Sequence, residues 1–330
     1  MPSERRSASE TLARCASLLT DATVDVLWRQ WAAVGASAST PAAARALVDP
    51  EALVLASLAF GDVERRLRDV LGDWVATNAD LLSVQRTRNL MGGYPESMKE
   101  SIDWIAGVAL REAKDSRWRS LVGSHSATSE STSLPRRRKN KVRARRVTFT
   151  TPATLWLKLR LGLGVGVKAD VLAYLVCQDA EMGATVRALE ERLGYTNGAT
   201  RRALDDLSEA GMVRTTPERG AVYWLDGTAW MAVLEIRDHR PSWRGWHNRF
   251  RFANGIQQLA SANPHDAHDA REFPSDYILT SRIRTQLEAT MGMFAWPMRN
   301  AVVRSATPSG WLVLLEEITS SLANEFRAIV

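Results

Sequence analysis

The sequence predicts a mainly α-helical protein in which one β-hairpin interrupts the helices. Apolar residues recur at spacings of three and four along most of the 330 residues, which is the period of helices that bury one face. Glycines and a proline-containing turn divide residues 151–228 into short helices followed by two short strands. Because compact domains usually hold about 100–200 residues, we expect three folded domains, covering residues 1–122, 151–228 and 229–330.

The first domain, residues 1–122, is expected to be entirely helical. Apolar side chains at helical spacing run through residues 12–34, and no alternating strand pattern interrupts them. A second helix is expected to begin at Pro50, because Asp49 before it can cap the helix, and its apolar stripe continues to Trp74. Two further helices are predicted over residues 80–90 and 96–118, on either side of a Gly92-Gly93 break.

A linker is expected after this domain, over residues 123–150. Its first part, residues 123–135, is rich in serine and threonine and lacks apolar periodicity, so it cannot offset the entropy of ordering a backbone. Its second part holds eight basic residues, whereas the whole chain has a net charge of only +6, so the basic charge is concentrated here. These residues are Arg136, Arg137, Arg138, Lys139, Lys141, Arg143, Arg145 and Arg146. We expect this basic run to stay extended until an anionic partner neutralises it.

Residues 151–228 are expected to form a compact unit of helices and a hairpin. The helices predicted in it cover residues 154–161, 167–176, 184–193 and 197–210. Gly194 ends the third of these, because glycine adopts the left-handed conformation without steric cost, and Thr196 is placed to cap the fourth. The glycines at 162, 164 and 166 lack the spacing of a phosphate-binding loop and indicate a flexible joint between the first two helices.

The helix predicted over residues 197–210 has two distinct faces. Its period buries Thr200, Ala203, Leu204 and Leu207. The opposite face carries Asn197, Gly198, Arg201 and Arg202. Small residues followed by arginines suit the major groove of DNA, because the helix can approach closely and the guanidinium groups can bind guanine edges and phosphates. Two strands, residues 212–215 and 221–225, are expected to follow, joined by a turn at 217–220.

Residues 184–225 resemble the winged helix-turn-helix regulators of the MarR and ArsR type. A helix, a glycine stop, an arginine-bearing second helix that ends in EAGMV, and a hairpin with a basic tip occur here in the same order as in those proteins. The resemblance implies a winged helix-turn-helix of three helices and a hairpin wing, with double-stranded DNA as its partner. The residues expected at the DNA are Thr196, Asn197, Gly198, Arg201, Arg202, Arg214 and Arg219, and the basic run is expected to add phosphate contacts.

The resemblance indicates a DNA-binding transcriptional regulator, whose flanking helical domains provide dimerisation, effector sensing or partner binding. The alternative is a nucleic-acid-binding or scaffolding subunit of a larger assembly, similar in layout to antitoxins and defence-associated proteins. A winged helix can also serve protein contact alone. An enzyme with a DNA-targeting module is a third hypothesis, but no nucleophile triad, carboxylate pair or nucleotide motif is visible, and we expect no enzyme activity.

The last domain, residues 229–330, is expected to return to helices. They are predicted after Pro241, over residues 277–290 and after Ser309. The last of them carries an apolar stripe of Trp311, Leu314, Leu315, Ile318, Leu322 and Phe326. We expect this stripe to join two copies in a homodimer, and the alternative is that it packs within its own domain. Trp243, Trp246 and Phe250 fall on one face, which indicates a core-facing helix rather than a platform for stacking on single-stranded nucleic acid.

No metal or other cofactor is expected. Four side chains could bind a metal: His265, Asp266, His268 and Asp269. They lie in an apparent loop, and no second cluster of ligands occurs at helical spacing. Cys15 and Cys177 lie far apart without nearby histidines, which argues against a disulfide framework and a cysteine-based zinc site. Neither a signal peptide nor an apolar run of about 20 residues is present. The sequence therefore predicts a cytoplasmic protein without membrane spans.

Overall fold

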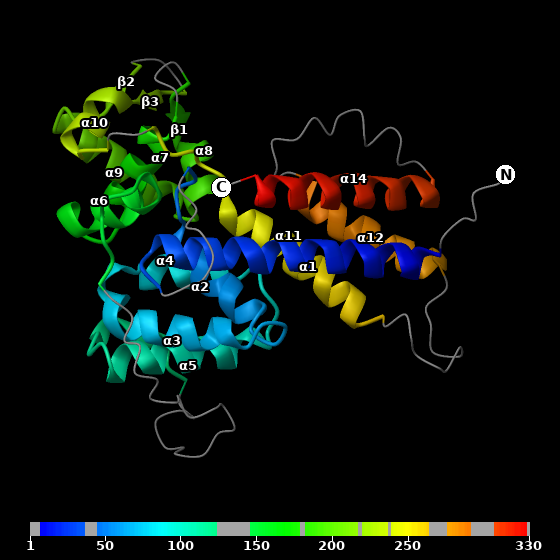
Figure 1. Cartoon of the computed structure of the whole chain (residues 1–330). Helices are drawn as coiled ribbons and strands as arrows, with labels where there is room; N and C mark the ends of the chain where they lie inside the picture. Colours follow the sequence, from blue (N-terminus) through cyan, green and yellow to red (C-terminus); the bar gives the residue numbers. More distant parts are fainter. Residues whose placement is uncertain are drawn as a thin grey trace. The chain divides into compact units, whose positions relative to one another are not determined.

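The protein is mainly α-helical and contains one small three-stranded sheet, which confirms the predicted fold class at this level (Figure 1). The computed structural model describes residues 7–36, 45–123, 146–178, 182–216, 220–236, 239–263, 276–291 and 307–328. The chain groups into two compact units. Unit 1 comprises Met1–Val26 with Asn248–Ile329, and unit 2 comprises Leu27–His247. The predicted domain boundaries stay predictions, and each unit is described by itself.

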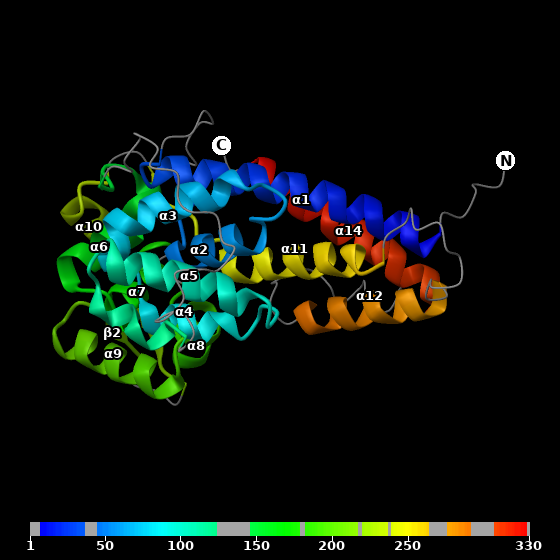
Figure 2. The ribbon, with the colours of Figure 1, turned by 90° about the horizontal axis from the view of Figure 1, so that it is seen from below.

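Unit 1 is a group of helices around an apolar core. It contains the first part of α1 (Ala8–Ala33), most of α11 (Trp246–Ser261), α12 (Asp276–Met291) and α14 (Pro308–Arg327). The predicted apolar stripe of α14 is buried within this unit, where Phe326 lies 6.0 Å from Phe250 between ring centroids. α14 runs beside α1, to which Glu316 is joined by an ion pair with Arg14 (Figure 2). The stripe therefore packs inside its own unit, as the alternative interpretation expected, and offers no free apolar face.

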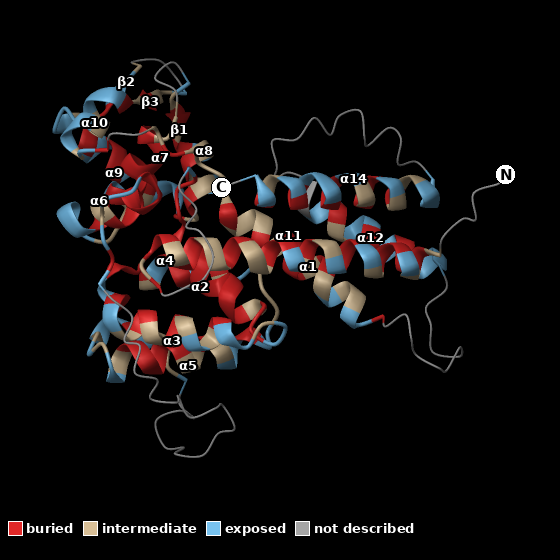
Figure 3. Ribbon diagram, viewed as in Figure 1, coloured by how far each residue is buried: buried red, intermediate tan, exposed pale blue. Residues whose placement is uncertain are grey.

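The first half of unit 2 is built from short helices. They are α2 (Pro50–Ala59), α3 (Arg66–Asn78), η1 (Ala79–Leu81), α4 (Val84–Met91), α5 (Met98–Arg111) and η2 (Ser116–Leu121). α2 begins as predicted, because Asp49 Oδ1 accepts a hydrogen bond from Ala52 N at 3.1 Å and Pro50 occupies the first turn. Almost every residue of α2 is buried (Figure 3).

The prediction of one helix from Pro50 to Trp74 was wrong. α2 ends at Ala59 and α3 starts at Arg66. Gly61 and Asp62 are turn-forming residues, and Val63 in the expected apolar stripe is 49% exposed, so no packing holds a continuous helix together here. The helices predicted over 80–90 and 96–118 are likewise shorter, each beginning or ending in a separate 3₁₀ turn.

The second half of unit 2 contains the sheet. Its elements are η3 (Pro152–Thr154), α6 (Leu155–Leu163), α7 (Val167–Val176), β1 (Ala184–Thr185), α8 (Val186–Leu193), α9 (Asn197–Glu209), β2 (Arg214–Thr215), β3 (Val222–Trp224) and α10 (Gly227–Val233). The four predicted helices are confirmed to within two residues at each end. The helix predicted over 184–193 starts two residues later, at Val186, because Ala184 and Thr185 form β1. The Thr185 hydroxyl caps α8 by accepting a hydrogen bond from Ala188 N at 3.2 Å.

The sheet has the strand order β1-β3-β2, and both pairs are antiparallel. Ala184 pairs with Tyr223 on one side of β3, and Arg214 pairs with Trp224 on the other. The two strands predicted from the sequence are thus present but short, and residues 217–219 of the predicted turn lie outside the described residues.

One apolar cluster unites the second half of unit 2. Its buried members come from every helix from α6 to α9 and from the strands, and include Leu155, Trp156, Leu172, Leu189, Leu193, Leu204, Leu207 and Tyr223. Trp243 packs against Trp156 with ring centroids 4.9 Å apart, and Trp246 and Phe250 are almost fully buried. The core-facing interpretation is therefore confirmed for Trp246 and Phe250, whereas Trp243 lies before α11 and is only partly buried. Of the helices the structure describes, none has both the length and the apolarity needed to cross a membrane.

Candidate nucleic-acid interface

Helix α9 is anchored on its inner side and capped at its start. The Thr196 hydroxyl accepts a hydrogen bond from Ala199 N at 3.4 Å, which confirms the predicted cap. The residues expected to face the core, Thr200, Ala203, Leu204 and Leu207, are all buried. Gly194, with φ of 74°, ends α8 in the predicted left-handed conformation. The backbone of α9 is thereby held in a defined position on the core of unit 2.

The outer face of α9 carries the residues predicted to meet DNA. Asn197, Gly198, Arg201 and Arg202 are all exposed. A Cβ atom on Gly198 would meet nothing within 4 Å, so this face is open to a ligand. Within the described part of the chain, neither Arg201 nor Arg202 has a hydrogen bond or ion-pair partner. Their guanidinium groups are available to an external acceptor.

Acidic residues restrict the positive charge to the first half of α9. Asp205, Asp206 and Glu209 follow the two arginines on the same helix, and Lys168 pairs with Asp206 at 2.7 Å. At the start of the helix, Asn197 Nδ2 donates to Glu190 Oε2 of α8 at 3.2 Å. The positive side chains of α9 therefore lie in the half nearer its N-terminus, and the unpaired N–H groups of the first turn add positive charge at that end.

The other predicted contact residues are only partly described. Arg214 is exposed on β2, whereas Arg219 and residues 136–145 of the basic run lie outside the described residues. Arg146, the last residue of the run, makes a bidentate ion pair with Asp80, in which both N···O distances are 2.6 Å. It also donates to the carbonyl oxygen of Thr77 at 3.2 Å. Arg146 is thus tied to the helical half of unit 2.

A buried cluster of charged residues lies between the two halves of unit 2, and sequence reasoning missed it. Its members are Asp49, Glu51, Arg86, Arg160 and Asp170, with side-chain exposures between 0% and 4% where ion pairs are formed. Burying so many charges is costly unless each is paired and hydrogen-bonded. The signal in the sequence was a charged residue at an apolar position, because Arg86 lies four residues from both Leu82 and Leu90.

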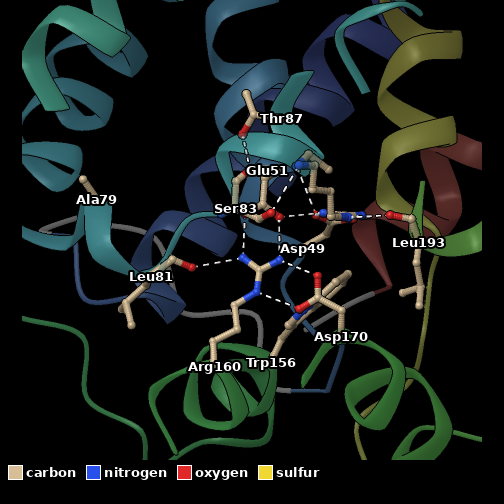
Figure 4. A network of polar contacts seen from close by, with 12 residues as sticks. Asp49, Glu51, Ala79, Leu81, Ser83, Thr87, Trp156, Arg160, Asp170 and Leu193 are labelled. Atoms are coloured by element: carbon tan, nitrogen blue, oxygen red, sulfur yellow. Dashed lines mark hydrogen bonds and ion pairs between the residues drawn. The ribbon is translucent and has the colours of Figure 1, made fainter. Parts of the chain in front are cut away.

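Arg160 joins α6 to the N-terminal helices through the cluster (Figure 4). Its Nη1 donates to Glu51 Oε1 at 2.6 Å and to the carbonyl oxygen of Leu81 at 3.0 Å. Its Nε and Nη2 donate to the two oxygens of Asp170 on α7 at 2.8 and 2.7 Å. Trp156 Nε1 also donates to Asp170, at 2.6 Å. Nη2 also donates to Glu51 Oε2 at 3.0 Å, so all five N–H groups of Arg160 are bonded to a carboxylate or a carbonyl.

Arg86 joins α4 to the end of α8. Its Nη1 and Nη2 donate to the two oxygens of Asp49 at 2.5 and 2.7 Å, and Nη1 also donates to Glu51 Oε2 at 2.7 Å. Its Nε donates to the carbonyl oxygen of Leu193, the last residue of α8, at 2.7 Å. The guanidinium lies 4.7 Å from the centroid of the Trp156 ring, which adds a cation–π contact.

Backbone dipoles balance the excess of carboxylates over guanidinium groups in this cluster. Asp49 caps α2, and Glu51 and Asp170 lie in the first turns of α2 and α7, where the positive ends of the helix dipoles favour negative charge. Burial raises the pKa of Glu51, but Arg160 and Arg86 outweigh it, so that pKa lies below its ordinary value. Burial and the charge of Asp170 raise the pKa of the Tyr195 hydroxyl. Glu51 is therefore ionised, and Tyr195 is neutral, at neutral pH.

No group of three or more possible metal ligands occurs among the described residues, and residues 264–275, which include His265 and Asp269, lie outside them. Cys15 and Cys177 are both free thiols. No protein-family model, curated protein or solved structure matches this chain.

Proposed function

We propose that residues 151–228 are a winged helix-turn-helix and that the protein is a sequence-specific, DNA-binding transcriptional regulator. The order of elements supports this proposal: helix, strand, two helices joined by a tight turn, then two strands, with the last strand between the other two in the sheet. In this arrangement α9 is the recognition helix, and β2 and β3 are the strands of the wing.

The exposed N-terminal half of α9 carries the proposal. Close approach to a base pair requires small residues, and discrimination between bases requires donors in a fixed geometry. Gly198 supplies the first, and Arg201 and Arg202 supply the second from a helix whose other face is buried. Arg214 on β2 and the basic run at 136–146 add contacts to phosphates.

A homodimer is part of the proposal, because winged-helix regulators commonly match two-fold symmetric operators. The apolar stripe of α14 is not its interface, since that stripe is buried within unit 1. We place the protein in the cytoplasm, where DNA and free thiols coexist.

A second candidate function is a scaffolding or nucleic-acid-binding subunit of a larger assembly. One observation favours it: α10, next to the proposed wing, has no buried residue except Gly227, and Val233 on it is 76% exposed. Apolar side chains that are exposed together form the patches that suit protein contact, and Met212, just before β2, is exposed as well. In this alternative, binding to DNA is indifferent to sequence and a protein partner copurifies with the chain.

Selection of duplexes from a random-sequence pool by the full-length protein tests the proposal. We expect enrichment of one common sequence, with two related half-sites if the protein binds as a dimer. Arg201→Ala/Arg202→Ala should enrich nothing, while the control Arg284→Ala/Arg327→Ala, which removes two exposed arginines of unit 1, should enrich the same sequence. Retention of duplexes without enrichment would support the alternative function instead.

A further inference from the structure

Helix α4 contacts the turn between α8 and α9 at consecutive residues. Arg86 Nε donates to the carbonyl oxygen of Leu193 at 2.7 Å, and Asn89 Nδ2 donates to that of Gly194 at 2.9 Å. A Cβ atom on Gly194 would lie 2.6 Å from Leu90 Cδ2, so the Leu90 side chain packs directly against this glycine. Three residues of one short helix therefore hold the turn.

The next residue of the turn, Tyr195, is held by α7 and by the residue that caps α4. The Tyr195 hydroxyl donates to Asp170 Oδ2 at 2.8 Å and lies 3.3 Å from Ser83 Oγ, the residue that caps α4. Leu193, Gly194 and Tyr195 are thus each fixed by groups outside the α8–α9 pair. Thr196, the cap of α9, follows immediately, so the direction in which α9 starts is set by these contacts.

We propose that α4 is a clamp that positions α9 for base recognition, with Arg86 and Asn89 as its positioning residues. This inference rests on the proposed function. For a bidentate contact with guanine, the guanidinium must lie within about 0.5 Å of its ideal position. A small rotation at Gly194 would change the direction of α9 and displace Arg201 by more than that. Holding the turn before DNA arrives avoids the entropy cost of ordering it on binding.

The composition of the clamp favours positioning over simple stabilisation. Buried ion pairs such as Arg86–Asp49 stabilise a fold no better than well-packed apolar residues, but they fix one arrangement of the elements they join. Asn89 is exposed, so it contributes no core packing, yet its amide is directed at the turn. The helical half of unit 2 thereby acquires a role in DNA recognition that its own surface does not indicate.

Asn89→Ala in the full-length chain tests the clamp, with Gln85→Ala as the matched control. Gln85 is also exposed on α4, but its side chain has no hydrogen bond to a described residue. The readouts are the ratio of affinities for the selected duplex and a random duplex, the salt dependence of both, and hydrogen exchange without DNA. The amides to follow are those of Gly194 and Thr200, which bond to Glu190 and Thr196.

We expect Asn89→Ala to lower the affinity ratio about 2- to 10-fold, the range that one neutral hydrogen bond allows, and to leave the salt slope unchanged. Hydrogen exchange at both amides should accelerate. Gln85→Ala should change neither the affinity ratio nor the exchange rates. Arg86→Lys keeps a positive charge beside Asp49 but loses the Nε–H group that donates to the carbonyl oxygen of Leu193. It should lower the affinity ratio at least as much as Asn89→Ala does.

An unchanged ratio in Asn89→Ala, with or without a lower free energy of unfolding, overturns the clamp, because Asn89 would then be structural only. Unchanged exchange overturns it as well. If the wild-type protein does not distinguish the duplexes, the proposed function fails. The exchange measurement, made without DNA, then separately decides whether α4 holds the turn.

Discussion

Arg86 donates a hydrogen bond to the carbonyl oxygen of Leu193 at 2.7 Å, although the two residues are 107 positions apart in the chain. The last carbonyl groups of a helix lack partners within the helix, so a side chain that reaches one also satisfies a buried acceptor. Because Arg86 is at the same time paired with Asp49 and Glu51, the end of α8 is connected to the start of α2 through a single guanidinium. The buried cluster therefore joins the helical half of unit 2 to the proposed DNA-binding half.

Removing one guanidinium from this cluster should be strongly destabilising. Arg160→Met leaves Glu51 and Asp170 buried without their main partner, which costs about 3–5 kcal/mol of unfolding free energy. Chemical denaturation measures this loss of unfolding free energy. The control Arg284→Met, which breaks an exposed ion pair with Glu288, should leave the transition almost unchanged. A loss below about 1 kcal/mol for Arg160→Met would contradict the buried network.

Glu51 should make stability fall in acid. Its pKa in the folded protein is lower than its ordinary value of 4.5, so the folded state favours the ionised form. The resulting stabilisation is complete above the unfolded pKa, near 4.5, and is lost as the pH falls through the folded pKa. Urea unfolding at a series of pH values should show a steeper acid loss for the wild type than for Glu51→Gln. Equal slopes would show that Glu51 is not paired.

Gly194 and Leu90 should be energetically coupled. Gly194→Ala forces a side chain into a left-handed backbone, at a cost of about 1–2 kcal/mol, and adds a clash with Leu90. Leu90→Ala removes the clash but creates a cavity. In a double-mutant cycle we expect the double variant to be less destabilised than the sum of the single variants, by about 0.5–3 kcal/mol. Additive effects would mean that α4 does not pack against the turn.

Local signals in the sequence were enough to predict α9 and its faces. Thr196, Gly194 and the apolar spacing of Ala203 and Leu207 each act within a few residues, and the structure bears them out. The buried cluster could not be predicted in this way, because its pairs join residues far apart, such as Glu51 and Arg160, 109 positions from one another. Asp49 was recognised only as a helix cap, since sequence spacing does not reveal a second partner.

Two other features escaped prediction for related reasons. β1 is only two residues long, and it exists because Ala184 pairs with Tyr223 on β3. The break between α2 and α3 was missed because an apolar stripe at helical spacing continues across Gly61. A tertiary contact therefore decides the backbone at β1, whereas the turn-forming residues Gly61 and Asp62 decide it between α2 and α3.

The basic run at residues 136–146 should add affinity without preference for sequence. Each phosphate contact that releases counterions steepens the fall of log K with log salt by about 0.9. Replacing the seven basic residues before Arg146 by glutamine, with Arg146 kept for its ion pair with Asp80, should therefore weaken binding to selected and random duplexes nearly equally and reduce the salt slope. Titrations of both duplexes at several salt concentrations measure these quantities. An unaltered slope would show that the run is only a solvated spacer.

The most direct test of the central claim, that α9 reads base pairs, is the affinity ratio of the Arg201→Ala/Arg202→Ala variant. One well-formed arginine–base contact discriminates by about 1–3 kcal/mol, so losing two should reduce the ratio between selected and random duplexes by at least about tenfold. Affinity for the random duplex should fall much less, and Arg284→Ala/Arg327→Ala should preserve the ratio. If the ratio of the α9 variant equals that of the wild type, α9 does not read the sequence and the account is contradicted.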